Sequence, residues 1–403
     1  MKLSSQKKRI FFFLLLLVTL GQFGVDLYLP SLPHIAKSLQ STISSIKLTI
    51  PLYLLGFGIS QLFYGPLSDA FGRKPILHFG FSLFFLGSLG CLLAANGTML
   101  ILFRTLQGLG IGAAIVNVRA IMRDAFHGKQ MAKISAWIVM TWTITPIVAP
   151  VIGGYIQSYI GWRANFAVML FYSLSIWLFL FFLLPETIDK QHQKKRRFSS
   201  LLRTYAAIFS DKVFVSFSFM SSFCYGYFIS FVTASPFILQ SRLGFSPVQY
   251  GWSLLLVAVG TALGSILCNR LVSSTKILHI IFAGSLIMLF SALLMYFFAQ
   301  MHIFTAFALI GPAFLGSVGG GMLFPNCTTG AMTPHKGKAG MAGASIGFIQ
   351  MFNAFIFSFI ISHLPTKTAL PLSLELLAIT VLNFVLFIFY VYPHFKEESE
   401  EGS

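Results

Sequence analysis

The chain is built from long apolar runs separated by short polar segments. Most runs extend over about 20 residues, the length at which an α-helix crosses the hydrocarbon core of a bilayer. Spans of this length predict an all-α membrane protein with twelve transmembrane helices. We expect these helices over residues 10–29, 47–66, 76–95, 99–121, 134–154, 164–184, 213–236, 248–269, 277–299, 303–328, 340–362 and 371–392.

Composition supports a membrane location for most of the chain. Of the 403 residues, 56% are hydrophobic and only 10% are charged, and the mean hydropathy is +0.81. Ordinary soluble domains carry about 25% charged residues. The shortage of charge excludes a soluble globular protein and indicates that the lipid bilayer is the chain's main surrounding.

The formal net charge is +17, and the bases that produce it lie in the polar segments. They gather on one side of the predicted membrane, and Lys2, Lys7, Lys8 and Arg9 are the first of them. The opposite segments hold only Lys37, Lys47, Arg163, Arg242 and Lys367. Because cytoplasmic loops are enriched in Lys and Arg, this bias predicts that both termini are cytoplasmic. Orientation accounts for the positive charge without nucleic-acid binding.

One longer polar segment divides the chain into two halves. It covers residues 185–212 and contains Lys194-Lys195-Arg196-Arg197. We expect a six-helix bundle in residues 1–184, a basic cytoplasmic linker, and a second six-helix bundle in residues 213–403 with a short cytoplasmic tail. The basic run is interpreted as an orientation signal, and a site for lipid head groups is the alternative.

The two halves show weak internal repetition in their glycines. Gly108-Leu109-Gly110-Ile111-Gly112 in the fourth predicted helix has a counterpart in Gly316-Ser317-Val318-Gly319-Gly320-Gly321 in the tenth. Small residues allow helix backbones to approach closely in membranes. The repetition favours two pseudo-symmetric bundles, with the glycines serving either moving helices or static packing.

A polar turn between the second and third helices combines glycines, one acid and two adjacent bases. It reads Gly65-Pro66-Leu67-Ser68-Asp69-Ala70-Phe71-Gly72-Arg73-Lys74-Pro75. A tight cytoplasmic turn needs glycine for the reversal and bases to hold it inside. This segment resembles the loop signature of the major facilitator superfamily, whose members are transporters. We expect a cytoplasmic gate formed by Gly65, Asp69, Gly72, Arg73, Lys74, Arg123 and Asp124, the alternative being a solvated turn that only sets topology.

Further motifs narrow the resemblance. Asp26-Leu27-Tyr28-Leu29-Pro30, Arg104-Thr105-Leu106-Gln107-Gly108 and Ala149-Pro150-Val151-Ile152-Gly153-Gly154 resemble drug:proton antiporters of the bicyclomycin-resistance (Bcr/CflA) type. The resemblance implies proton-coupled export of drugs or other small amphipathic molecules by alternating access, in the bacterial inner membrane. It also implies that an antiporter element of the fifth helix includes Pro146, Pro150, Gly153 and Gly154.

Few ionisable residues fall within the predicted spans. Asp26 and Arg104 are the clearest, and charges are costly enough in lipid to indicate function. At about 1.5 Å per residue, both lie at a similar depth, so that pairing between the two helices is possible. We expect them to couple transport to protons; a structural ion pair, or an Asp26 in outer water, is the alternative. Glu375 is interpreted as a helix cap.

Other polar side chains could line a substrate cavity. The candidates are Tyr53, Gln61, Gln107, Asn117 and Trp142. Polar residues in membrane bundles also hydrogen-bond neighbouring helices to one another, and this remains the alternative for each of them.

Other functional classes fit the sequence less well. The nine histidines are scattered and the four cysteines have no paired spacing, so we expect no metal, no cofactor and no enzymatic activity. A channel or receptor would need a filter-like polar run or a recognition domain outside the membrane. We expect a monomer that handles a small molecule and protons. An exporter of one endogenous metabolite or siderophore is the rival to a drug exporter.

Overall fold

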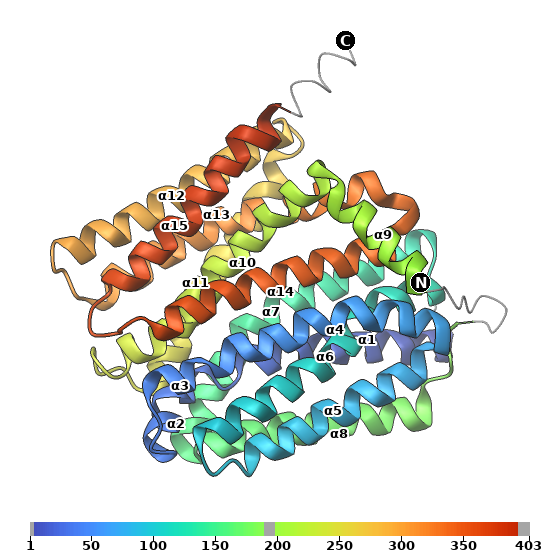
Figure 1. The fold of residues 1–403 in the computed structure, drawn as a ribbon, viewed down its shortest axis with the longest axis horizontal. Helices are drawn as coiled ribbons and strands as arrows, with labels where there is room; N and C mark the ends of the chain where they lie inside the picture. Colours follow the sequence, from blue (N-terminus) through green and yellow to red (C-terminus); the bar gives the residue numbers. More distant parts are fainter. Residues whose placement is uncertain (1–3, 189–197, 394–403) are drawn as a thin grey trace. The chain divides into compact units, whose positions relative to one another are not determined.

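The computed structural model describes residues 4–188 and 198–393, and the Lys194–Arg197 run lies outside them. In these ranges, twelve helices have the length and composition to cross a membrane, which confirms the predicted fold class (Figure 1). The contacts divide the chain into a first unit, residues 1–205, and a second unit, residues 206–403. The boundary falls within the segment predicted as the linker.

Six long helices form the membrane part of each unit. In the first unit they are α1 (Ser5–Asp26), α4 (Thr49–Phe71), α5 (Arg73–Leu92), α6 (Gly97–Ala125), α7 (Gly128–Tyr159) and α8 (Trp162–Leu183). In the second they are α10 (Lys212–Leu239), α11 (Pro247–Leu271), α12 (Ile277–Gln300), α13 (Ala306–Met332), α14 (Ala339–His363) and α15 (Leu370–Leu386). A 3₁₀ segment, η3 (Thr333–Lys338), precedes α14, and a π turn, η4 (Phe387–Val391), follows α15.

Two segments expected to be non-helical contain short helices. The connection after α1 forms η1 (Leu29–Ser31), α2 (Leu32–Ser38) and α3 (Ile43–Lys47). The predicted linker contains α9 (Phe198–Ser210), an amphipathic helix of 13 residues. Its Ile208 side chain is buried whereas Leu202 is exposed. A search for apolar runs of about 20 residues misses helices of this kind, because they are too short and too polar to cross the membrane.

The packing of the second unit repeats that of the first. In the first unit α6 packs against α4 and α5, α7 against α1, and α8 against α5. In the second, α13 packs against α11 and α12, α14 against α10, and α15 against α12. Each of these helix pairs in the first unit has a counterpart in the second unit, six long helices later in the chain. The predicted pseudo-symmetry of the two bundles is therefore confirmed.

Glycines of α6 and α13 allow close contacts between helix backbones. A Cβ atom on Gly108 of α6 would lie 2.1 Å from the carbonyl oxygen of Tyr53 in α4. A Cβ atom on Gly321 of α13 would lie 2.2 Å from the carbonyl oxygen of Thr261 in α11. Real Cβ atoms are not found this close to oxygen, so only glycine permits this spacing. The glycine-rich segments seen in the sequence thus pack α6 and α13 tightly.

Neighbouring side chains satisfy the carbonyl groups that two prolines leave without a helical donor. Pro66 has no N–H for the Leu62 carbonyl, and Tyr205 of α9 donates its hydroxyl to that oxygen at 2.9 Å. Pro325 leaves the Gly321 carbonyl without a helical donor in the same way, and Ser265 of α11 donates its hydroxyl to that oxygen at 3.3 Å. Burial raises the pKa of Tyr205 to about 12, and the nearby Asp69 carboxylate acts in the same direction. The phenol therefore remains a donor at neutral pH.

Two adjacent glycines of α13 offer a test of this packing. We expect Gly321→Ala to destabilise the protein by about 1 to 3 kcal/mol, because the methyl group must push α11 away. Gly320→Ala is the matched control, since the described structure has no heavy atom within 4 Å of a Cβ atom there. It should change stability by less than about 1 kcal/mol. Thermal unfolding of the purified proteins in detergent measures both changes in stability. Equal melting temperatures for the Gly321→Ala and Gly320→Ala proteins would contradict the close contact at Gly321.

Candidate functional site

The guanidinium of Arg104 lies in a fully buried cage formed by three helices of the first unit. It sits between the rings of Tyr28 and Tyr53, with its central carbon 4.3 and 4.2 Å from the two ring centres. Nη1 donates to Gln107 Oε1 at 2.7 Å, and Nη2 donates to the Gly24 carbonyl oxygen of α1 at 2.7 Å. Contact with two aromatic rings and two directed hydrogen bonds suits the planar group of arginine.

Several buried polar atoms around this cage are left unsatisfied. Oδ1 of Asp26, Oη of Tyr53 and Nε of Arg104 have no hydrogen-bond partner among the residues that the structure describes. The Asp26 side chain is only 2% exposed. Buried polar atoms are nearly always hydrogen-bonded in proteins, and unsatisfied ones indicate strain, a functional role or missing water. Their concentration around α1, α4 and α6 makes this region the candidate transport site.

Asp26 and Arg104 lie at a similar level, as the sequence predicted, but they do not form an ion pair in this structure. Arg104 binds the carbonyl of Gly24, two residues before Asp26. The terminal nitrogens of the guanidinium are used for Gln107 and the Gly24 carbonyl, and its central carbon lies over the rings of Tyr28 and Tyr53. The described structure thus shows an arrangement in which the acid and the base are separate.

The helix-five element packs directly beside Asp26. A Cβ atom on Gly153 of α7 would lie 1.8 Å from the carbonyl oxygen of Leu27, the residue after Asp26. The Asn165 side chain of α8 donates to Ser31 Oγ at 2.9 Å and to the Gly153 carbonyl at 3.4 Å. Pro150 and Gly154 are also buried in α7, whereas Pro146 is half-buried. This part of α7 therefore positions the end of α1 that carries the acid.

The five predicted cavity candidates have different surroundings. Gln107 joins helices, since its Nε2 donates to Ser88 Oγ of α5 at 2.7 Å while its oxygen binds Arg104. Tyr53 belongs to the Arg104 cage. Gln61 is buried with Nε2 unsatisfied among the described residues, and Trp142 is half-buried.

The remaining cavity candidate, Asn117, lies among the residues predicted for the cytoplasmic gate. Its Oδ1 accepts a hydrogen bond from Ser68 Oγ, and its Nδ2 donates to the Ala113 carbonyl at 2.8 Å. Arg73 also donates to Ser68 Oγ, at 3.2 Å. The sequence had offered Asn117 as a cavity candidate, with hydrogen bonding between helices as the alternative, and its contact with Ser68 of α4 is of this second kind.

Arg73 is the centre of the predicted gate cluster. It is 4% exposed, and it forms ion pairs with Asp69, through Nη1, and with Asp124, through Nε at 3.0 Å. These contacts link α4, α5 and α6 within the first unit. Lys74 donates from Nζ to the Phe181 carbonyl at 3.1 Å. Arg123 is exposed, and a Cβ atom on Gly65 would lie 3.7 Å from Val116, an ordinary contact distance, so the packing there does not require glycine.

Sequence reasoning missed one member of this cluster, Glu186. Its two carboxylate oxygens accept the backbone N–H groups of Arg73 and Lys74, each at 3.0 Å. An acid is favourable there because the first N–H groups of a helix have no helical acceptor. Gly72 is required as well, since its φ of 102° favours glycine and a Cβ atom would lie 2.8 Å from Glu186 Oε2. The only sequence signal was an acid next to Pro185 at a predicted helix end.

The two acids that pair with Arg73 are exposed to different extents, so we expect them to contribute unequally to transport. We expect Asp124→Asn to lower the transport rate about tenfold and Asp69→Asn to lower it less, with substrate binding nearly unchanged. The reason is solvent screening, because the Asp124 side chain is 19% exposed and that of Asp69 is 50% exposed. Transport into inverted membrane vesicles and equilibrium binding to purified protein measure the two effects.

Lys129→Gln provides the control for these variants. Lys129 is an exposed charge near the start of α7. Its removal should leave transport unchanged. Normal transport by correctly expressed Asp69→Asn and Asp124→Asn proteins would show that the turn only sets topology.

Comparisons with known proteins agree with the fold. The Major Facilitator Superfamily profile matches residues 12–362. The chain is 29% identical to a bicyclomycin resistance protein homolog of Haemophilus influenzae, covering 97% of this chain and 99% of that protein. It is 28% identical to multidrug resistance protein D of Escherichia coli, covering 87% of each. The xylose transporter XylE of E. coli superimposes with a TM-score of 0.74 at 14% identity, covering 96% of this chain and 98% of that one.

The low identity to XylE limits that comparison to the fold. The match to the family profile covers most of the chain, from α1 to α14, including the turn around Arg73. The relatives with related sequences cover nearly the full length. This multi-pass membrane protein therefore belongs to the Major Facilitator Superfamily of transporters.

Proposed function

We propose that this protein exports drugs or other small amphipathic molecules from the cytoplasm in exchange for protons. The observation that carries the proposal is the buried Asp26 carboxyl beside the caged Arg104, with one of its oxygens unsatisfied among the described residues. A carboxyl group in this setting is costly when charged, and it can exchange a proton for a substrate. The resistance-related names of the relatives support the substrate class.

The coupling step requires Asp26 to alternate between two states. When it is protonated, the neutral carboxyl is less costly to bury than the carboxylate. When it loses the proton, the carboxylate needs a positive partner, which either Arg104 or a cationic substrate provides. A ligand that stabilises only one of these states shifts the protein toward that state. Competition between proton and substrate for one carboxyl thus produces exchange.

The gate cluster has a separate role in this proposal. Arg73, Asp69 and Asp124 hold the ends of α4, α5 and α6 together. Helices that move as a body need such fixed contacts within the unit, and contacts that break control access to the site. The cluster thereby connects the cytoplasmic ends of these helices to the motion that exposes Asp26.

Drug susceptibility tests the proposed function. A bacterium lacking its main exporters, and expressing this chain, should tolerate higher concentrations of several unrelated amphipathic drugs. The Asp26→Asn protein, expressed at the same level, should give no protection. Unchanged susceptibility together with one metabolite accumulating in the medium would contradict drug export and assign a dedicated metabolite exporter instead.

We further propose that the protein acts as a monomer in the bacterial inner membrane, with both termini in the cytoplasm. The loop charge bias supports this orientation. Reporter fusions after Asn96, Tyr159, Arg242 and Thr366 should report an outside location. Fusions after Lys74, Lys195 and Lys336 should report an inside location. An outside signal at Lys195 would contradict the arrangement of six helices on each side of the linker.

A further inference from the structure

Exposed bases gather where α1 and α7 begin, at the same end of the first unit. They are Lys8, Arg9, Lys129 and Lys133. No acid balances them within the two helices, because α7 contains neither Asp nor Glu and the only acid of α1 is Asp26 at its far end. This end of the helix pair is therefore positively charged.

Two contacts determine which faces of α1 and α7 meet there. Lys7 Nζ donates to Gln130 Oε1 at 3.1 Å. The rings of Phe11 and Trp137 have centres 6.4 Å apart. The two helices thus run side by side in the same direction. They meet again at Gly153, beside the end of α1, so the groove between them is held at both ends.

Lys8 and Lys133 turn toward one side of this helix pair. Successive residues of an α-helix are about 100° apart around its axis. Measured from the line that joins the two helices, Lys8 then lies about 80° around α1 and Lys133 about 50° around α7, toward the same side. Arg9 lies about 180° from that line, on the side of α1 that faces away from α7. The two lysines therefore flank one groove, and Arg9 lies outside it.

Each of the two lysines precedes an exposed aromatic residue by one helical turn. Phe12 follows Lys8 by four residues and is 59% exposed, and Trp137 follows Lys133 by four residues and is 45% exposed. Both lysines come just before the apolar spans that the sequence predicts, and both rings lie inside those spans. The groove thus has positive charge at the membrane surface and apolar rings at the depth of the lipid chains.

This combination matches the chemistry of an anionic phospholipid. Its phosphate lies at the membrane surface, where lysines bind phosphate as point charges. Its acyl chains extend into the apolar interior, and bases beside the membrane attract lipids of negative charge. Tryptophan is common at the boundary between these two layers. A zwitterionic phospholipid has the same shape, but its ammonium group cancels the charge that the lysines select.

We infer that the groove between α1 and α7 binds one anionic phospholipid, with the phosphate between Lys8 and Lys133 and an acyl chain along Phe12 and Trp137. The site lies wholly within the first unit. It is separate from the Arg104 cage and does not depend on the proposed export function.

Native mass spectrometry of the delipidated full-length protein in detergent tests the inference. Phosphatidylglycerol is the probe, and phosphatidylcholine with the same acyl chains is the uncharged comparison. The unchanged protein should bind the first phosphatidylglycerol more tightly than the first phosphatidylcholine. Lys8→Gln and Lys133→Gln should each weaken phosphatidylglycerol binding about fivefold and leave phosphatidylcholine binding nearly unchanged.

Arg9→Gln is the matched control, because it removes the same charge from the neighbouring position of the same helix. It should change phosphatidylglycerol affinity less than about twofold. Asp26→Asn should bind both lipids as the unchanged protein does, so that a failure of the export proposal is recognised separately. Thermal unfolding of each variant establishes that it is folded.

Fluorescence quenching locates the acyl chain. Phosphatidylglycerol with bromine atoms on its chains quenches the tryptophans that it touches. Titration of the delipidated protein should quench a saturable part of the fluorescence, and Trp137→Phe should remove that part. Phenylalanine keeps an apolar ring, so the lipid should still bind. Quenching that stays the same in Trp137→Phe would place the lipid elsewhere and overturn the inference.

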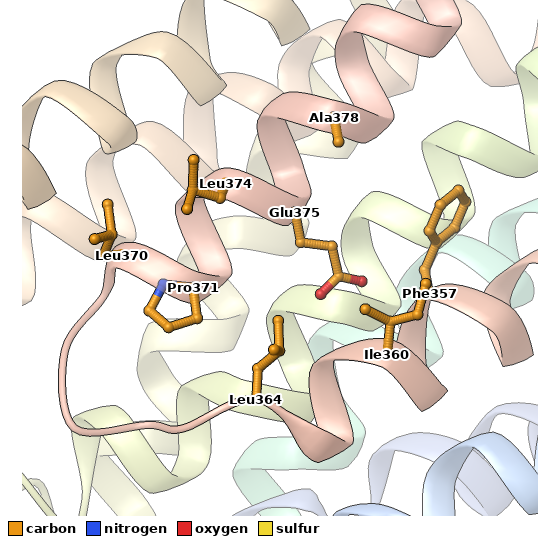
Figure 2. Close-up of a pocket in the computed structure, with 8 residues that line it drawn as sticks. All are labelled: Phe357, Ile360, Leu364, Leu370, Pro371, Leu374, Glu375 and Ala378. Carbon is orange, nitrogen blue, oxygen red and sulfur yellow. The ribbon is translucent and has the colours of Figure 1, made fainter.

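A cavity of about 460 Å³ between α14 and α15 is the alternative place for a lipid chain (Figure 2). Its wall is apolar, because the one acid that lines it, Glu375, is held by another helix: Oε1 accepts a hydrogen bond from Ser230 of α10 at 2.9 Å. Glu375 does not cap α15, as the sequence had suggested, since the helix begins at Leu370 and the acid lies in its second turn. No base lines this cavity, so it has no means of selecting an anionic head group.

Ala378→Phe separates the two places, because the larger side chain fills the cavity between α14 and α15. The preference for phosphatidylglycerol should remain in this variant. Its loss there would assign the anionic lipid to the second unit and overturn the inference. Equal affinity of the unchanged protein for the two lipids would do the same. An Arg9→Gln protein that loses as much affinity as Lys8→Gln would show that only the overall surface charge matters, and the groove would then not be a site.

Discussion

Asp26→Asn is expected to abolish proton-driven export and to leave downhill exchange of substrate in place. The amide imitates a permanently protonated carboxyl, so the variant can change conformation but cannot take up or release the proton. Proteoliposomes with an imposed pH gradient and a pH-sensitive dye inside measure drug-driven proton movement. We expect the signal to fall to that of empty liposomes.

Asp26→Glu is the matched control for that experiment. It keeps an ionisable carboxyl on a longer side chain and should retain part of the coupled activity. The end of α1 packs closely against Gly153 of α7, so the longer side chain is not expected to restore full activity. Normal coupling by the Asp26→Asn protein would exclude this residue as the proton carrier, and the proposed mechanism would then be wrong.

Arg104→Lys should be nearly as inactive as Arg104→Ala, although lysine keeps the positive charge. Lysine lacks the planar group that fits between Tyr28 and Tyr53 and that reaches two acceptors at once. Each lost hydrogen bond to a charged group costs about 1.5 to 3 kcal/mol. Both variants should therefore unfold at lower temperature and lose most of their transport in proteoliposomes.

Arg163 offers a close comparison for Arg104. It stacks on Trp162 at 4.2 Å and donates to the Ala94 carbonyl at 3.1 Å, so it makes the same kinds of contact at the end of the bundle. Arg163→Ala should lower stability but keep the transport rate of the folded protein. Equal transport losses at the two positions would mean that Arg104 has only a structural role.

The sequence predicted the fold well because long apolar runs have few alternatives in a membrane. The twelve apolar runs correspond to the twelve membrane-length helices of residues 4–188 and 198–393, and the glycines of α6 and α13 lie where backbones approach closely. The short helices were missed because their stability depends on the neighbours that they pack against. Tyr205 shows this dependence, since its partner is a carbonyl 143 residues away in the chain.

The candidate site was only partly predictable. Asp26 and Arg104 stood out because charges are rare in apolar runs, and helix rise placed them at one level. The acceptors of Arg104 could not be read from the chain, because backbone carbonyls such as that of Gly24 have no residue-specific signal. Glu375 was recognised as an intramembrane acid but was given the wrong local role, since only the packing of α10 beside α15 reveals Ser230.

The segment between α8 and α10 holds the turn around Arg73 from two sides. Glu186 binds the first N–H groups of α5, and Tyr205 binds the Leu62 carbonyl of α4. The segment therefore holds the ends of α4 and α5 in place in addition to connecting the two units. Two separately expressed fragments divided after Tyr205 would keep both attachments in the first fragment. Fragments divided before Phe198 would lose the attachment to α4, and complementation between halves would then depend on the position of the cut.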